Sequence, residues 1–228
     1  MLEKPLNPTG PTADGVLRWP TGRSRDWLLA FLNSARSDTN ILAVIAVGSA
    51  VRPGVPSSDL DMLVACTNPS GFAVARPLEI DMRVYCAADI PSQLATGHDL
   101  LGWAVMFGQV LFQRESFWDK MVGSWRHRLP LPSSTLARSR VAAAHRYMRD
   151  LLQIGDADAA REQAISCLTH LARAELLEKG VYPASRPELP EQLRKIGDHH
   201  LARRLDCLLE EDAADLSQVG ELLRLTAK

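Results

Sequence analysis

Long apolar runs are missing from this sequence, and no stretch approaches the roughly 20 apolar residues that a membrane-spanning helix needs. The first residues, MLEKPLNPTGPTADG, also lack the apolar core of a signal peptide. We therefore expect a cytoplasmic protein that has no membrane partner.

An excess of positive charge is missing as well, because 26 Lys and Arg residues stand against 27 Asp and Glu residues, for a net charge of −1. Proteins that bind long nucleic acids usually carry a basic excess. We therefore expect no long nucleic acid as a partner, whereas a small substrate or a protein target remains compatible with this charge.

Cysteines are few, and the four that occur form no C-x-x-C pair, so a zinc site is not expected. Each lies in an apolar neighbourhood, which predicts the role of a small buried hydrophobic residue for all four: Cys66, Cys86, Cys167 and Cys207.

Several signatures of nucleotide-binding and hydrolytic enzymes are also missing. The sequence contains no G-x-x-x-x-G-K-[ST], and no G-x-G-x-x-G follows a predicted strand. A P-loop and a dinucleotide-binding fold are therefore unsupported. Neither H-E-x-x-H nor G-x-S-x-G occurs, which leaves zinc-protease and serine-hydrolase chemistry without a motif.

The informative stretch runs from residue 41 to residue 65 and consists of two apolar segments joined by a polar connector. The first segment, ILAVIAV over 41–47, is typical of a strand that is buried on both faces. It ends at Gly48 and Ser49, where small residues let the backbone approach a ligand. The connector contains Arg52, and the second segment begins with SSDLD over 57–61.

Two acids in the second segment, Asp59 and Asp61, have the spacing that places side chains on one face of a strand. Like charges this close are costly unless a cation lies between them. Carboxylate oxygens suit Mg²⁺, which takes one or two carboxylates together with waters and substrate phosphates. The turn at Gly48 and Ser49 would offer backbone N–H groups and a hydroxyl to those phosphates.

This pattern resembles the signature of the DNA polymerase beta nucleotidyltransferase superfamily, and in particular its minimal and kanamycin nucleotidyltransferase-like members. The matching residues are Gly48, Ser49, Arg52, Ser58, Asp59 and Asp61. The resemblance implies transfer of a nucleoside monophosphate from a nucleoside triphosphate, with ATP expected, to a small-molecule hydroxyl, with release of pyrophosphate. It also implies two Mg²⁺ ions, and nucleotide binding by Gly48, Ser49, Arg52 and Ser58. The alternative is a hairpin whose aspartates cap a turn.

In the resembled family a third carboxylate comes from a neighbouring strand. The segment LEIDMRVY over 78–85 alternates apolar and polar residues, which predicts a half-buried strand. Asp81 is the first candidate for the third metal ligand beside Asp59 and Asp61, and Glu79 is the second. Arg83 lies on the same predicted face and could offset the acids or bind a phosphate.

The remaining pattern of the first half predicts a helix over 25–36 capped by Ser24, a helix over 92–107, a short strand over 110–112 and a helix over 116–126. With the strands above, this predicts an α+β fold: a mixed β-sheet with flanking helices, followed by an all-α bundle. Prolines at 130 and 132 place a boundary between a nucleotidyltransferase domain, 1–128, and a helical domain, 129–228.

The second half contains no β-rich segment, and its apolar residues recur at helical spacing. Helices are expected from Ser133 or Ser134 to about residue 154, from Asp156 or Asp158 to residue 179, and as shorter pieces over 191–225. This half resembles the helical domains that follow minimal nucleotidyltransferases, including the HEPN-like type. This resemblance leaves two alternative functions open: a nucleotide-binding regulator or protein-adenylylating antitoxin-like protein, and a catalytically inactive relative. It also leaves a homodimer possible.

Overall fold

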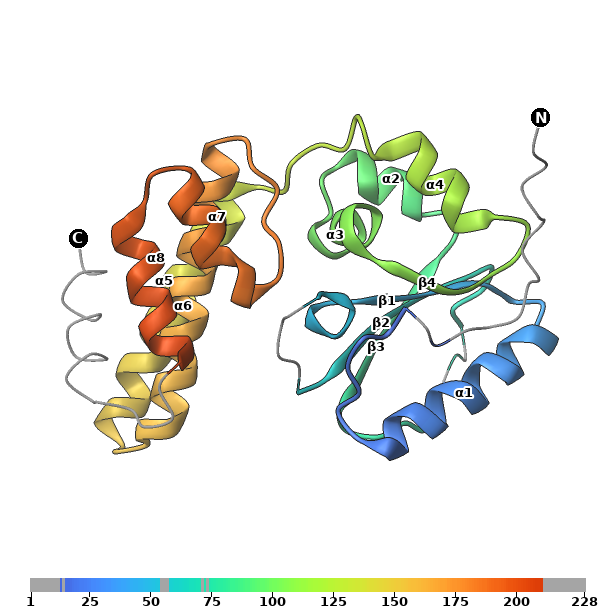
Figure 1. The fold of residues 1–228 in the computed structure, drawn as a ribbon, viewed down its shortest axis with the longest axis horizontal. Helices are drawn as coiled ribbons and strands as arrows, with labels where there is room; N and C mark the ends of the chain where they lie inside the picture. The colour runs from blue at the N-terminus through green and yellow to red at the C-terminus, as the bar shows by residue number, and fades with distance from the viewer. Residues whose placement is uncertain (1–12, 14, 54–57, 71, 73, 211–228) are drawn as a thin grey trace. The chain divides into compact units, whose positions relative to one another are not determined.

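The computed structural model describes residues 13, 15–53, 58–70, 72 and 74–210, and the chain divides into two compact units, 1–130 and 131–228 (Figure 1). The first unit is a mixed sheet with helices, and the described part of the second is helical, as the sequence predicts. The functional assignment of the predicted domains, 1–128 and 129–228, stays a prediction.

A four-stranded sheet with the order β3-β2-β1-β4 forms the centre of the first unit. Strand β1 pairs antiparallel with both β2 and β4, whereas β2 and β3 are parallel. The central position of β1 explains its uniformly apolar sequence, because both of its faces are covered. The strands are β1 (Ile41–Val47), β2 (Leu60–Cys66), β3 (Ile80–Cys86) and β4 (Gln109–Gln113).

Helices cover both faces of this sheet. Helix α1 (Gly22–Ser37) lies against one face, and three helices lie against the other (Figure 1). Leu28 and Leu32 of α1 and Trp118 of α4 are fully buried. The three helices on the second face are α2 (Ile90–Ala95), α3 (Asp99–Phe107) and α4 (Phe117–Trp125).

The N-terminus of α1 differs from the sequence prediction, because Thr21 and not Ser24 caps it. The Thr21 hydroxyl oxygen accepts a hydrogen bond from the Ser24 backbone N–H at 3.1 Å. Ser24 is instead buried in the first turn, and its own hydroxyl donates to Glu79 Oε1 at 2.9 Å. The helix thus begins three residues earlier than the predicted start at Arg25.

The single helix predicted over 92–107 is two helices, α2 and α3. Gly97 has φ +74°, a left-handed conformation that ends a helix and that favours glycine. His98 then caps α3, since its Nδ1 accepts from the Leu101 backbone N–H at 3.3 Å. The strand predicted over 78–85 begins at Ile80, and Leu78, predicted to face the core, is fully exposed.

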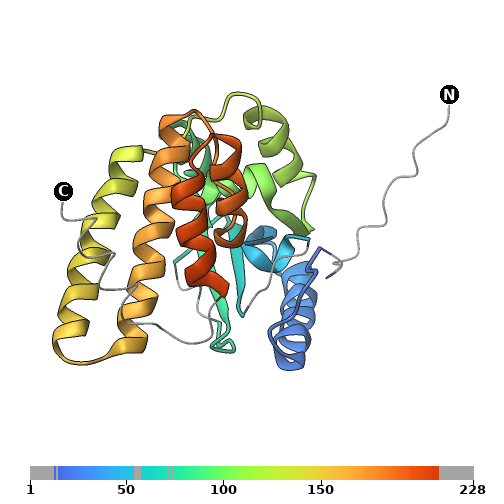
Figure 2. The ribbon, with the colours of Figure 1, turned by 60° about the vertical axis from the view of Figure 1, so that its left-hand side comes forward.

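The second unit is built on two long helices, α5 (Ser134–Gln153) and α6 (Ala157–Glu178), which run alongside each other, and α8 (His199–Glu210) lies next to α6 (Figure 2). A shorter helix, α7 (Leu189–Lys195), precedes α8. The side chains of Ser133 and Asp156 cap α5 and α6, which settles both open cap assignments. Helices expected beyond residue 210 lie outside the described residues.

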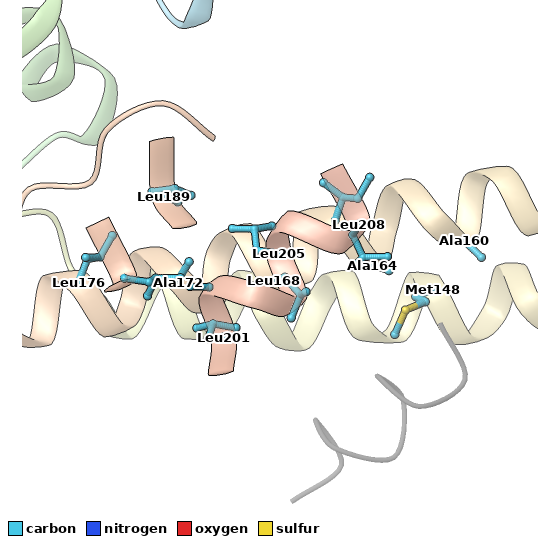
Figure 3. Close-up of a cluster of buried hydrophobic side chains, with 13 residues drawn as sticks. Met148, Ala160, Ala164, Leu168, Ala172, Leu176, Leu189, Leu201, Leu205 and Leu208 are labelled. Atoms are coloured by element: carbon cyan, nitrogen blue, oxygen red, sulfur yellow. The ribbon is translucent and has the colours of Figure 1, made fainter. Parts of the chain in front are cut away.

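Leucine and alanine side chains form the core of this helical unit (Figure 3). Leu168 and Ala172 of α6 and Leu205 of α8 are buried there. Arg138 of α5 adds a polar link on the surface, because its guanidinium donates to Glu178 at 2.7 and 2.8 Å and to Glu175 at 2.9 Å. No helix in the described part of the chain has the length and apolar character to cross a membrane.

The cysteines follow the prediction only in part. Cys66 and Cys167 are buried, and burial raises the pKa of both thiols. Cys86 is partly buried, and the prediction is wrong for Cys207, which is exposed on α8.

Candidate functional site

Three carboxylates gather at the end of the sheet where β1 ends and where β2 and β3 begin. Asp61 is the register partner of Val47 on one side and of Asp81 on the other. Directly paired residues project from the same face of a sheet, so Asp61 and Asp81 are neighbours on that face. Asp59 lies immediately before β2, and its charge acts on Asp61.

Gly48 makes room for the central carboxylate of this group. Its backbone has φ +78° and ψ −161°, a region that is essentially restricted to glycine. A Cβ added to Gly48 would overlap Asp61 Oδ2. The glycine at the end of β1 therefore holds a conformation that other residues avoid, and it leaves the space that the Asp61 carboxylate occupies.

The electrostatic surroundings of Asp61 show an excess of negative charge. Burial, and then the charges of Asp59 and Asp81, raise the pKa of Asp61 from 3.8 to about 6. Arg83 acts in the opposite direction, but it does not cancel these effects. A group with a pKa raised in this way is stabilised by any further cation that comes close to it.

Asp81 forms an ion pair with Arg83, in which Arg83 Nη2 donates to Asp81 Oδ2 at 2.8 Å. Of the two roles that the sequence allows for Arg83, an offset to the acids or a contact with a phosphate, the ion pair supports the first, and the second stays a prediction. Within the described ranges, no three His, Cys, Asp or Glu side chains are close enough together to hold a metal ion. The acids are thus neighbours, but they do not form a closed coordination cage.

Glu79 has a different role from Asp81, which lies two residues further along the chain. Its carboxylate accepts hydrogen bonds from the hydroxyls of Thr21 at 2.7 Å and Ser24 at 2.9 Å. The bond from Thr21 is the largest cause of a lowered pKa of Glu79. Of the two candidates for a third carboxylate, Asp81 is the one beside Asp61, and Glu79 holds the first turn of α1.

The predicted nucleotide-binding residues lie around the same end of the sheet. Ser49 opens a short 3-10 helix, η1 (Ser49–Val51), directly after Gly48. The Arg52 guanidinium lies over the Phe107 ring, 4.9 Å from its centroid. Ser58 is exposed next to Asp59 at the start of β2, and residues 54–57, including Ser57 of the SSDLD segment, lie outside the described residues.

Sequence reasoning did not foresee two features of this site. One is that the Asp61 carboxylate lies against Gly48, for which the sequence indicates a phosphate contact that stays a prediction. The other is the edge-on contact of Tyr85 with His98, with ring centroids 5.6 Å apart, beyond Arg83 on β3. Only the alternation of polar residues along 79–85 hinted that Tyr85 would share the face of Asp81.

Comparison with known proteins finds similarity to solved structures but not to family models or curated proteins. No protein-family model matches it, and no curated protein matches it. Among solved structures it is similar to a nucleotidyltransferase-like protein from Exiguobacterium sibiricum 255-15, with 19% sequence identity and a TM-score of 0.44. That match covers 90% of this chain and 73% of the other. The structural similarity to a nucleotidyltransferase-like protein is thus distant, and function has to be inferred from the residues of the site.

Proposed function

We propose that this protein is a metal-dependent nucleotidyltransferase that transfers a nucleoside monophosphate, with ATP as the expected donor, to the hydroxyl of a small molecule. The hydroxyl oxygen attacks the α-phosphorus and releases its proton to solvent, the bond to the bridging oxygen of the β-phosphate breaks, and pyrophosphate leaves with the electron pair of that bond. The observation that carries this proposal is the position of Asp61 between the charges of Asp59 and Asp81, against the backbone of Gly48.

The chemistry of this group of residues fits a divalent cation. Its donors are all carboxylate oxygens, which suit Mg²⁺, and they carry more negative charge than Arg83 neutralises. The space left by the missing side chain of Gly48 is used by a carboxylate oxygen of Asp61. Asp59, Asp61 and Asp81 would hold the cation, with two ions in the full proposal, and their side chains would have to come closer together on binding than the described structure has them. When bound, the metal would neutralise charge on the α-phosphate and on the departing pyrophosphate.

The chain itself would position the triphosphate beside these acids. Ser49 at the start of η1 and Ser58 before β2 provide hydroxyls at the same end of the sheet. Arg52 provides a positive charge whose orientation is fixed by its contact with Phe107. Placement of the reacting groups and neutralisation of their charge supply most of the catalysis in phosphoryl-type transfers.

The direct test is pyrophosphate release from Mg-ATP with a panel of hydroxyl acceptors, measured for the wild type, Asp61→Asn and Asp26→Asn. Asp26 is an exposed carboxylate on α1 and serves as the matched control. We expect release by the wild type and by Asp26→Asn, and a loss of at least about a hundredfold in Asp61→Asn. Equal ATP binding and equal release by all three proteins would overturn the proposal.

A second candidate is a catalytically inactive relative that still binds nucleotide. The ion pair between Asp81 and Arg83 favours this alternative, because Asp81 already interacts with a positively charged side chain of the protein itself. This alternative predicts that ATP binds with a measurable affinity but that no acceptor in the panel gives pyrophosphate. Release with any acceptor, abolished in Asp61→Asn, would exclude it.

A further inference from the structure

Two cysteines, Cys66 and Cys86, are the last residues of the parallel strands β2 and β3 and are register partners of each other. Directly paired residues project from the same face of a sheet. Neighbouring strands lie about 4.8 Å apart, and the Cα atoms of a disulfide are usually about 4.4–6.8 Å apart. The backbone of this pair therefore already has the separation that a disulfide needs.

Each of the two thiols is directed toward the strand of the other. Cys66 Sγ donates to the Tyr85 carbonyl oxygen on β3 at 3.5 Å, and Cys86 Sγ donates to the Thr67 carbonyl oxygen, directly after β2, at 3.6 Å. Burial is the largest cause of the raised pKa of Cys66, and the neighbouring Cys86 is the next. Both cysteines are free thiols, so the two sulfurs face a common gap without a bond between them.

This pair of thiols is separate from the acidic group. Cys66 lies five positions after Asp61, and Cys86 lies five positions after Asp81. Because successive residues of a strand alternate between faces, the thiols project from the face opposite to the acids, at the other end of the same strands. Cys66 is fully buried, whereas Cys86 is partly exposed on β3, an edge strand of the sheet. A small oxidant from solvent therefore meets Cys86 first.

We propose that Cys66 and Cys86 form an oxidation site, at which hydrogen peroxide converts the two thiols into a disulfide that a dithiol reductant reverses. The Cys86 sulfur attacks one oxygen of the peroxide, the O–O bond breaks, and the departing hydroxide takes the thiol proton, which leaves a sulfenic acid and water. The Cys66 sulfur then attacks the Cys86 sulfur, the S–O bond breaks, and the second hydroxide leaves with the Cys66 proton as water. The two thiols together lose two electrons, which the peroxide gains.

The test is oxidation of the full chain by hydrogen peroxide at pH 8 in a Cys207→Ser background. Cys207 is exposed on α8, and its removal prevents disulfides between molecules. Trypsin cuts after Arg83, so a disulfide between Cys66 and Cys86 joins two peptides that mass spectrometry identifies without reduction. A chromogenic thiol reagent counts the remaining thiols in denaturant. Cys167→Ala is the matched control, since Cys167 is a buried thiol on α6.

We expect the oxidised protein to lose two of the three thiols that remain after Cys207→Ser, and the linked peptides to appear. Reduction with dithiothreitol should restore both thiols. Cys167→Ala should leave the linked peptides unchanged, whereas Cys86→Ser and Cys66→Ala should each abolish them. Because the linked peptides are observed without changing either cysteine of the pair, the result does not depend on the folding of these two variants.

Two results would overturn the oxidation site. One is a sulfinic acid on Cys86 without the linked peptides, which would show that Cys66 does not reach the oxidised sulfur. The other is unreacted Cys66 and Cys86 under conditions that oxidise Cys207 of the wild type. Neither result would bear on the proposed nucleotidyltransferase activity, which uses other residues.

Discussion

The carboxylate of Asp61 occupies the space in which a side chain of residue 48 would begin, so that Gly48 and Asp61 depend on each other. The acid can point toward the end of β1 only because the residue there has no Cβ. The glycine is also held in a conformation that other residues avoid.

Replacing Gly48 by alanine should therefore destabilise the protein by about 2–4 kcal/mol, through backbone strain and overlap with Asp61. Chemical denaturation measures this loss. Gly123→Ala is the control, because the described residues leave open space around Gly123 and its helix favours alanine. Asp61→Ala should stabilise the Gly48→Ala variant more than it stabilises the wild type, because only in that variant does it also remove the overlap, and equal effects in the two backgrounds would contradict the overlap.

The raised pKa of Asp61 gives the stability of the protein a definite dependence on pH. The pKa of Asp61 rises on folding from 3.8 to about 6, so the native state holds this proton more tightly than the unfolded state does. Ionisation of Asp61 then costs stability as the pH rises from about 4 to above 6, by at most about 3 kcal/mol. Asp61→Asn should thus be more stable than the wild type at pH 7.5, and the gain should vanish near pH 4.

Thermal unfolding across this pH range checks the expectation, with Asp26→Asn as a control for the loss of an ordinary exposed carboxylate. A gain of stability in Asp61→Asn that persists at pH 4, or no gain at pH 7.5, would mean that ionisation of Asp61 does not destabilise the native state.

The contribution of Glu79 to stability should depend on pH with the opposite sign. Its pKa is lowered by hydrogen bonds from Thr21 and Ser24, so its contribution is present above the usual pKa of a glutamate and is lost as the pH falls through the lowered value. Ser24→Ala, which removes one of these bonds, should lower the melting temperature at pH 7. This loss should shrink in acid, and denaturation curves at pH 7 and pH 3.5 compare the two conditions.

Arg114 caps the C-terminal end of α1. Its guanidinium donates hydrogen bonds to four backbone carbonyls there. The acceptors are the carbonyl oxygens of Ala35 at 2.8 Å, Arg36 at 2.7 Å, Asp38 at 3.0 Å and Ile41 at 2.9 Å. The last carbonyls of a helix have no partner within the helix, so the loss of Arg114 leaves several acceptors unpaired. Arg114→Lys should cost about 2–4 kcal/mol, since an ammonium cannot reproduce the planar fork.

The control for this change is Arg126→Gln, which removes an arginine with one long bond, 3.5 Å, to the Met106 carbonyl. Equal melting temperatures of Arg114→Lys and Arg126→Gln would show that the four carbonyls are satisfied equally well by solvent.

The sequence predicted β1 well because its physical determinants are local. The apolar run 41–47 is β1 to the residue, whereas the spacing of Asp81 and Arg83 was compatible both with their ion pair and with a contact between Arg83 and a phosphate. The pairing of Asp61 with Asp81 is different. It depends on the parallel register of β2 and β3, which the packing of the whole sheet determines.

Helix ends were the least predictable elements, because several residues competed for each end. Thr21 and Ser24 are both good caps, and Glu79, which is distant in sequence, engages both of their hydroxyls. The sequence is compatible with Gly97 inside a single helix over 92–107, whereas its left-handed backbone separates two helices. In each case the outcome depended on a contact or a dihedral angle that residue types alone do not specify.

Helix α1 is fastened at both ends by segments that flank the sheet, with Glu79 at its first turn and Arg114 at its last. Glu79 is only two residues from Asp81. A shift of the first residues of β3 would therefore be transmitted through Glu79 to the first turn of this helix. Slower amide hydrogen exchange in that first turn on addition of a divalent ion would then indicate binding of the ion at the acids, which lie on the other face of the sheet from α1.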